Sequence, residues 1–142
     1  MQATCKNDKI KNGMEVYEDG LHVEEAFLTN GDASYISDDN KVQVGENVCL
    51  RMIIKGWKAE DGKVFMDASQ TVTTSAGDTL TSNPSLFGIK LLYGTVAQSA
   101  DHVLLYQTIG SLKNPSEHII ISFKVCDKTT NKSVHGSYKL YL

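Results

Sequence analysis

The segment from Glu117 to Leu142 constrains the fold most strongly, because apolar and polar residues alternate in it on both sides of a polar turn. In the first half, the apolar side chains on one face are those of Ile119, Ile121, Phe123 and Val125. In the second half, the alternating apolar residues are Val134, Tyr138 and Leu140. A period of two is typical of antiparallel strands with one face on a core and one in water. Residues 127–132 between the halves favour a turn, so the pattern predicts a closing hairpin.

The same period recurs along the chain. It is clearest in VCLRMIIKGW, where one face carries Val48, Leu50, Met52 and Ile54. Weaker strand-like segments cover residues 21–29, 42–44, 63–74, 79–81 and 103–109. Asn83-Pro84 favours the start of one short helix that continues through Leu86, Phe87, Ile89 and Leu92. These elements predict an all-β fold, a two-sheet antiparallel β-sandwich of six to eight strands with one short helix.

Length and charge limit the organisation and the partners. A chain of 142 residues is expected to form one domain, and we assign the sandwich to residues 21–142. Residues 1–20 are polar and unpatterned, which predicts a flexible leader. The net charge is −3 and Arg51 is the single arginine, a composition that argues against nucleic-acid binding. No apolar run reaches 18 residues, so we expect no membrane-spanning segment.

Two cysteines invite a disulfide interpretation. The order Cys49, Trp57, Cys126 resembles the immunoglobulin pattern, in which a tryptophan packs on a disulfide between the sheets. The alternation argues against it, because Cys49 shares a face with Arg51 and Cys126 shares one with Lys124. A disulfide between the sheets needs both side chains in the core. The sequence therefore favours two free thiols on the less buried faces over a disulfide.

Cys5 resembles the acylated cysteine at the mature start of an exported bacterial lipoprotein. It follows the small residues Ala3 and Thr4 and precedes a polar stretch, residues 6–9. The resemblance implies an extracytoplasmic domain whose contact with a membrane is a lipid anchor. It requires an apolar leader upstream, since none lies between Met1 and Cys5. The alternative is an unmodified cysteine in the leader.

The sequence offers little support for catalysis. The four histidines, His22, His102, His118 and His135, are scattered, and no G-x-S-x-G motif occurs. No Cys and His pairs have zinc spacing, and no glycine-rich phosphate loop is present. We therefore predict that the protein is not an enzyme.

Two binding hypotheses remain. Asp32, Asp38 and Asp39, with Asn40 and Glu46, provide the oxygen ligands that Ca²⁺ prefers. They lack the ordered spacing of an EF-hand, so the sequence favours the alternative that they are solvated turn residues. Ca²⁺ is the one cofactor that the sequence suggests. Trp57 with Tyr93 or Tyr106 would form an aromatic platform for sugar rings. The alternative for Trp57 is a place at the edge of the core.

The chain from about Leu21 to Leu142 resembles the immunoglobulin-like and fibronectin-like sandwiches of exported bacterial envelope proteins. The resemblance is carried by V-G-E-N-V-x-L-x-M-x-I at Val44 to Ile54 and by the final G-S-Y-K-L-Y-L. It implies a noncatalytic binding or structural role in the periplasm or at the cell surface, with a protein or glycan partner. A carbohydrate-binding module is the second interpretation and a hydrolytic enzyme the third, because fold alone does not fix function.

Overall fold

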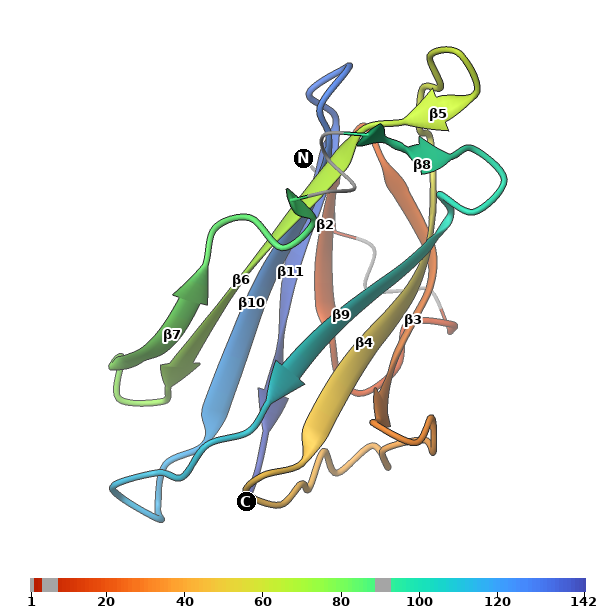
Figure 1. The fold of residues 1–142 in the computed structure, drawn as a ribbon. Helices are drawn as coiled ribbons and strands as arrows, with labels where there is room; N and C mark the ends of the chain where they lie inside the picture. The colour runs from red at the N-terminus through yellow and green to blue at the C-terminus, as the bar shows by residue number, and fades with distance from the viewer. Residues whose placement is uncertain (1, 4–7, 89–92) are drawn as a thin grey trace.

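The computed structural model describes residues 2–3, 8–88 and 93–142, and these form a two-layer sandwich of antiparallel strands (Figure 1). The strands are β1 (Gln2–Ala3), β2 (Glu15–Asp19), β3 (His22–Asn30), β4 (Asn47–Lys55), β5 (Lys63–Val64), β6 (Met66–Thr74), β7 (Thr79–Asn83), β8 (Thr95–Val96), β9 (His102–Thr108), β10 (Ile119–Asp127) and β11 (Ser133–Leu140). The all-β sandwich predicted from the sequence is confirmed.

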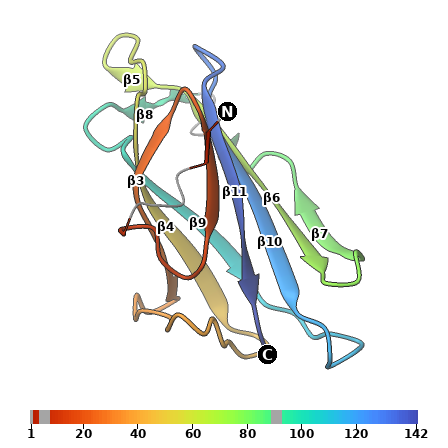
Figure 2. The same ribbon diagram turned by 180° about the vertical axis from the view of Figure 1, so that it is seen from behind.

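The two layers differ in width. The large sheet has the order β1-β2-β11-β10-β6-β7, and in Figure 2 its strands β11, β10, β6 and β7 lie side by side. The small sheet has the order β3-β4-β9, and β5 and β8 form a separate pair. The predicted closing hairpin is β10 with β11, paired from Ile119↔Leu140 to Cys126↔Ser133.

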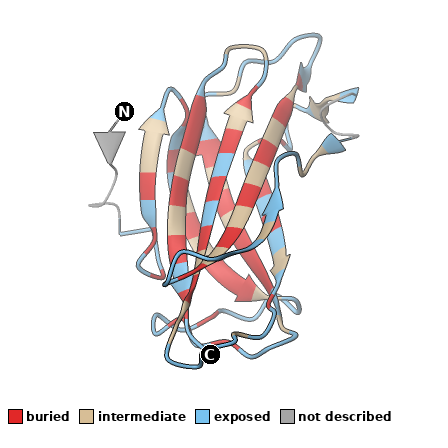
Figure 3. Cartoon of the chain, turned by 90° about the vertical axis from the view of Figure 1, so that its left-hand side faces the viewer, coloured by how far each residue is buried: buried red, intermediate tan, exposed pale blue. Residues whose placement is uncertain are grey.

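The core lies between the two sheets, and burial alternates along the strands that enclose it (Figure 3). The large sheet contributes the predicted residues Ile119, Ile121, Phe123 and Val125, each at most 3% exposed. The small sheet contributes Val48, Leu50, Met52 and Ile54, each at most 2% exposed. Burial of apolar surface on this scale is the main favourable term in folding, so the alternation identified both faces of the core correctly.

The prediction of a flexible leader over residues 1–20 is wrong for its second half. Residues 15–19 form β2, which pairs with β11 along the large sheet, from Ser133↔Asp19 to Ser137↔Glu15. Met14 is 6% exposed and Val16 is 3% exposed, so both belong to the core. The pattern was hard to recognise because these two apolar residues stand among acidic and amide side chains.

The backbones of β11 and β2 approach each other closely at Gly136, which pairs with Val16. A Cβ atom built on Gly136 would lie 2.2 Å from the carbonyl oxygen of Glu15 and 2.8 Å from Cζ of Phe123. No side chain fits there without displacement of a neighbouring strand. Glycine at this position therefore permits both the contact with β2 and the packing of the Phe123 ring.

Two buried asparagines fasten the N-terminal segment to both sheets. Asn12 Nδ2 donates to Asn40 Oδ1 at 2.8 Å, and Asn12 Oδ1 accepts from the Leu28 amide at 3.0 Å. Asn40 Nδ2 donates to the carbonyls of Asn12 and Lys139, at 2.9 and 2.7 Å. Both side chains are 4% exposed, so each amide is satisfied inside the protein. Asn40, which the sequence suggested as an oxygen ligand, is a structural residue.

The predicted short helix falls partly on residues 89–92, outside the described residues. Its expected N-cap, Asn83, is instead the last residue of β7. The Leu86 amide donates to the Ala68 carbonyl at 2.8 Å. This hydrogen bond holds the chain that follows β7 beside β6. No helix among the described residues is long and apolar enough to cross a membrane.

The two described cysteines are free thiols, as predicted, but only one of them is accessible. Cys49 is 0% exposed although it lies on the outer face of the small sheet. Its partners in the neighbouring strands are Thr29 and Tyr106, whose side chains share that face. Burial raises the pKa of the Cys49 thiol, so little reactive thiolate forms at neutral pH. Cys126 is half-buried.

We expect iodoacetamide to label Cys126 in the native protein far faster than Cys49, because only the Cys126 thiol is accessible. Peptide mass spectrometry after timed quenching would measure the two rates. The same experiment in denaturant is the control, and there the rates should converge. Equal rates in the native protein would contradict the burial of Cys49.

Asp127 is a fully buried carboxylate that organises the closing turn. Its Oδ1 accepts from the Thr129 amide and its Oδ2 from the Lys58 amide, each at 2.9 Å. We expect Asp127→Ala to lower the free energy of unfolding by about 3 kcal/mol, since two amide donors lose a charged acceptor. Urea unfolding would measure it. Asp127→Asn keeps one carbonyl acceptor, so it should lower the free energy of unfolding by less. If Asp127→Ala leaves the free energy of unfolding unchanged, Asp127 does not stabilise the turn.

Candidate ligand groove

A groove of about 650 Å³ runs along the side of the sandwich at β9. Most of its wall is apolar and comes from Met66, Leu86, Phe87, Val103, Leu104 and Tyr106. The polar wall residues are Thr95, Ser99 and His102. Ligand sites are typically concave and mostly apolar, with a few polar groups that set orientation. The groove has that composition.

The groove follows from the unequal width of the two sheets. β9 is the last strand of the small sheet, whereas the facing large sheet continues through β6 to β7 (Figure 1). Leu86 and Phe87 are held at the far wall, because their amides donate to Ala68 O at 2.8 Å and to Asp67 Oδ1 at 3.2 Å. The flank of β9 that faces away from β4 and this wall enclose the space between them.

Two buried polar atoms in and beside the groove have no hydrogen-bond partner. One is Oγ1 of Thr95, in the wall. The other is Oε1 of Gln70, a residue of β6 that is 1% exposed. Nε2 of Gln70 donates at 3.2 Å to the carbonyl of Tyr106, which lines the groove. Buried polar atoms without partners are rare in folded proteins and call for an explanation.

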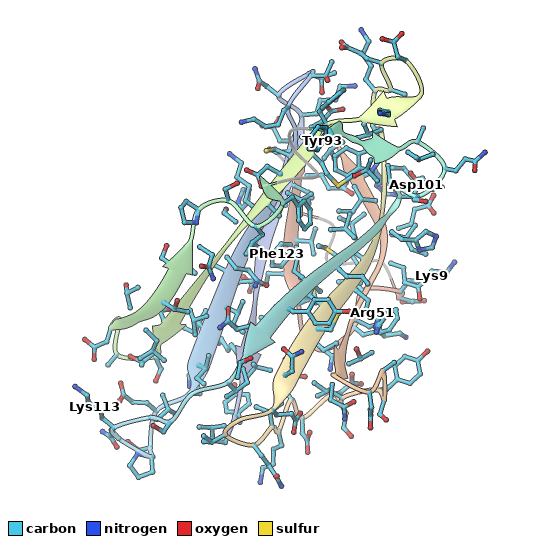
Figure 4. All side chains as sticks on the ribbon, viewed as in Figure 1. Lys9, Arg51, Tyr93, Asp101, Lys113 and Phe123 are labelled. Atoms are coloured by element: carbon cyan, nitrogen blue, oxygen red, sulfur yellow. The ribbon has the colours of Figure 1, made fainter. Side chains whose placement is uncertain are left out.

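The structure does not bring the three aromatic residues of the predicted sugar platform together. Trp57 packs against the core, and its Nε1 donates to the Ile54 carbonyl at 3.0 Å. Tyr106 pairs with Cys49, six residues before the end of β4, so roughly 20 Å of strand separates it from the end that carries Trp57. Tyr93 is 64% exposed and lies near β8 (Figure 4). Only Tyr106, 49% exposed, lines the groove.

The predicted calcium ligands are engaged in local turns. The pKa of Asp32 is lowered by hydrogen bonds from Ser34, whose amide donates to Asp32 Oδ1 at 2.9 Å. Asp39 Oδ1 accepts from the Lys41 amide at 3.2 Å, and Asp38 lies beside the buried Asn40. Among the described residues, no group of three His, Cys, Asp or Glu side chains is placed to hold a metal ion. Calcium binding stays a prediction.

The remaining predicted sites are dispersed. Cys5, the expected acylation site, lies outside the described residues. His22 contacts Glu18 at 2.7 Å, His135 stacks on Tyr17, and His118 packs on Tyr141. Only His102 lines the groove. No sequence motif marks this groove. The signal that the sequence does contain is the uncharged segment HVLLYQT, which forms β9.

Comparisons with known proteins add little. No protein-family model matches the chain, and no curated protein matches its sequence. Among solved structures, the chain is similar to chicken MD-1, which was crystallised with lipid IVa. The TM-score is 0.38 and the identity 15%, over 99% of this chain and 97% of that one. A likeness this distant assigns neither a family nor a ligand.

Proposed function

We propose that this chain is a noncatalytic binding domain whose ligand occupies the groove beside β9. The observation that carries the proposal is the groove itself. Its volume of about 650 Å³ falls within the usual range of ligand sites. Its apolar wall favours burial of an apolar group, and Ser99 and His102 supply polar side chains in the same wall.

We further propose an extracytoplasmic location at a bacterial cell envelope. The support is the resemblance of Val44 to Ile54 and of the terminal hairpin to envelope sandwiches, together with the sequence around Cys5. In this proposal Cys5 carries the lipid anchor and the partner is a protein or a glycan. Mass spectrometry of the Cys5 peptide from the native host tests it. An unmodified thiol there would remove the anchor.

The groove is tested with 8-anilinonaphthalene-1-sulfonate, a dye whose fluorescence rises in apolar sites. We expect saturable binding of one dye per chain, and we expect Ser99→Trp to weaken it because the new ring fills the groove from an exposed wall residue. The matched control is Ser111→Trp, at an exposed serine beyond the end of β9. Absent binding, or equal loss in both variants, would contradict the proposal.

A carbohydrate ligand is the second candidate, and one observation favours it. The Tyr106 side chain is 49% exposed at the groove and offers a ring on which a sugar would stack. A panel of oligosaccharides, monitored by the NMR signals of the Tyr106 ring, tests this candidate. Binding that Tyr106→Ala leaves unchanged would count against it.

A further inference from the structure

The hydrogen-bond pattern of β9 leaves half of its backbone groups directed away from the sheet. The Ile54 amide donates to Asp101 O at 2.8 Å, and the Ile109 amide donates to Glu46 O at 2.9 Å. In an antiparallel pair such bonds recur at every second residue. The odd-numbered residues of β9 therefore bond to β4, and Leu104 and Tyr106 present their N–H and C=O groups to the groove. The bond from Gln70 to Tyr106 O agrees with this parity.

The sequence and register of β9 include none of the charges, prolines or bulges by which proteins usually prevent strand addition. β9 has seven residues, HVLLYQT, with no Lys, Glu, Asp or Pro, and its pairing with β4 shows no register shift. Charges, prolines and bulges normally protect exposed edges. The edge at β3 has a bulge near Glu24, and Ala26 there bonds with Lys9 and Lys11. The edge at β7 is short and polar, with an irregular register.

A protein side chain already takes the place of one missing strand contact. Gln70 Nε2 donates to Tyr106 O, while Gln70 Oε1 is buried without a partner. A side-chain amide presents N–H donors and a C=O acceptor, the same kinds of group as a peptide bond. The Nε2 group of Gln70 therefore takes the place of a strand N–H at the edge of β9. Its Oε1 atom is an acceptor without a partner beside the same edge.

We propose that the groove receives an extended peptide, which adds to β9 as a fourth strand of the small sheet. This inference rests on the proposed function, because it names the ligand class of the same groove. Strand addition pairs the N–H and C=O groups of Leu104 and the N–H of Tyr106, whose carbonyl keeps its hydrogen bond from Gln70. Alternate side chains of the peptide enter the apolar groove. A space of about 650 Å³ holds a few residues of an extended segment.

The opposite face of the added strand meets Arg51, which Figure 4 places on the outer side of β4. Arg51 pairs with Leu104, and its Nε donates to Thr29 Oγ1 at 3.0 Å. Among the described residues, the salt bridges are His22–Glu18 and Lys55–Asp101, so the Arg51 guanidinium is in none. A guanidinium in an apolar setting favours a carboxylate. The preferred peptide is therefore apolar on its groove side and acidic on its outer side.

The probe is the peptide acetyl-Val-Thr-Val-Glu-Val-Thr-Val-amide. Two analogues carry N-methyl groups, one on the valines and one on the Thr and Glu residues. A peptide added to β9 bonds through the N–H groups of only one of these two sets. Antiparallel pairing uses the N–H groups of Thr and Glu, and parallel pairing uses those of the valines. We expect one analogue to bind about tenfold or more weakly by isothermal titration calorimetry. In NMR spectra, the Leu104 and Tyr106 amides should become protected from hydrogen exchange.

Two variants of the protein sharpen the test. Leu104→Pro removes an N–H that faces the groove and not β4, a place where an edge strand tolerates proline, and it should abolish peptide binding. Leu104→Ala keeps the N–H and is the matched control. Arg51→Gln should weaken the Glu peptide several-fold and leave a version with Thr in place of Glu unchanged. If Leu104→Pro does not fold, the two N-methylated peptides still test strand addition on the unchanged protein.

The outcomes separate this inference from the proposed function. If the dye binds the groove but both methylated peptides bind as well as the parent, strand addition is wrong and the groove remains a ligand site. If neither dye nor peptide binds, both proposals fail. A dimer that forms through β9 without peptide, shown by protection of Leu104 at high concentration, would also overturn the peptide assignment.

Discussion

Removal of residues 137–142 will abolish folding of the domain. β11 pairs with β10 along its whole length, so the deletion leaves Ile119 to Ser122 of β10 without their partners in β11. The deletion removes Tyr138 and Leu140, 2% and 0% exposed, and each large buried side chain contributes several kcal/mol. It also removes the Lys139 carbonyl, to which Asn40 Nδ2 donates at 2.7 Å. Together with the lost strand pairings, the total reaches the range of about 5–15 kcal/mol that is the whole stability of a typical domain.

The truncated chain should show no cooperative transition in urea when unfolding is followed by circular dichroism and Trp57 fluorescence. The matched control removes Leu142 alone, which is 45% exposed and follows the last strand. That deletion should leave the midpoint almost unchanged. A chain ending at Gly136 that melts like the full protein would show that the edge of the core has been placed wrongly.

Gly136→Ala should be the most damaging single methyl addition in the described chain. The new Cβ would meet the Glu15 carbonyl oxygen at 2.2 Å and Phe123 Cζ at 2.8 Å. The first of these atoms belongs to the backbone of a paired strand, so relief requires β2 to move away from β11. Overpacking of this kind typically costs 1–3 kcal/mol and more when the backbone is involved, so we expect a loss of about 3 kcal/mol or more.

Urea unfolding of Gly136→Ala and Gly110→Ala would test this. Gly110 has no atom within 4 Å of a built Cβ, and its backbone is outside the left-handed region. Its replacement should be neutral or slightly stabilising, because alanine restricts the unfolded chain. If both variants lose the same small amount, β2 does not approach β11 as closely as described.

Local alternation predicted the fold well where the apolar face was continuous. Both faces of the core were identified from β4 and β10, because in each strand four apolar residues alternate without interruption. β2 was missed because its inner face is marked only by Val16 and by Met14, which directly precedes the strand. The parity of Cys49 was predicted correctly but its burial was not, since the covering residues Thr29 and Tyr106 come from strands distant in sequence.

The groove was beyond local reasoning for a related reason. It exists because β9 is the last strand of one sheet while the other sheet continues, and strand order is a property of the whole chain. The polar residues illustrate the same limit. Asn40 belongs to an internal network that ends on Asn12 and Lys139, 28 and 99 positions away. Nothing in the neighbourhood of a polar residue distinguishes a buried amide from a ligand.

The position of β11 also fixes the order in which the domain can assemble. β2 belongs to the first fifth of the given chain, yet its partner β11 is the last described strand in chain order. Because distant pairings form late, the large sheet stays incomplete until Leu140 has left the ribosome. Through synthesis the chain therefore lacks the strand that joins β2 to β10, and it stays unfolded for that interval.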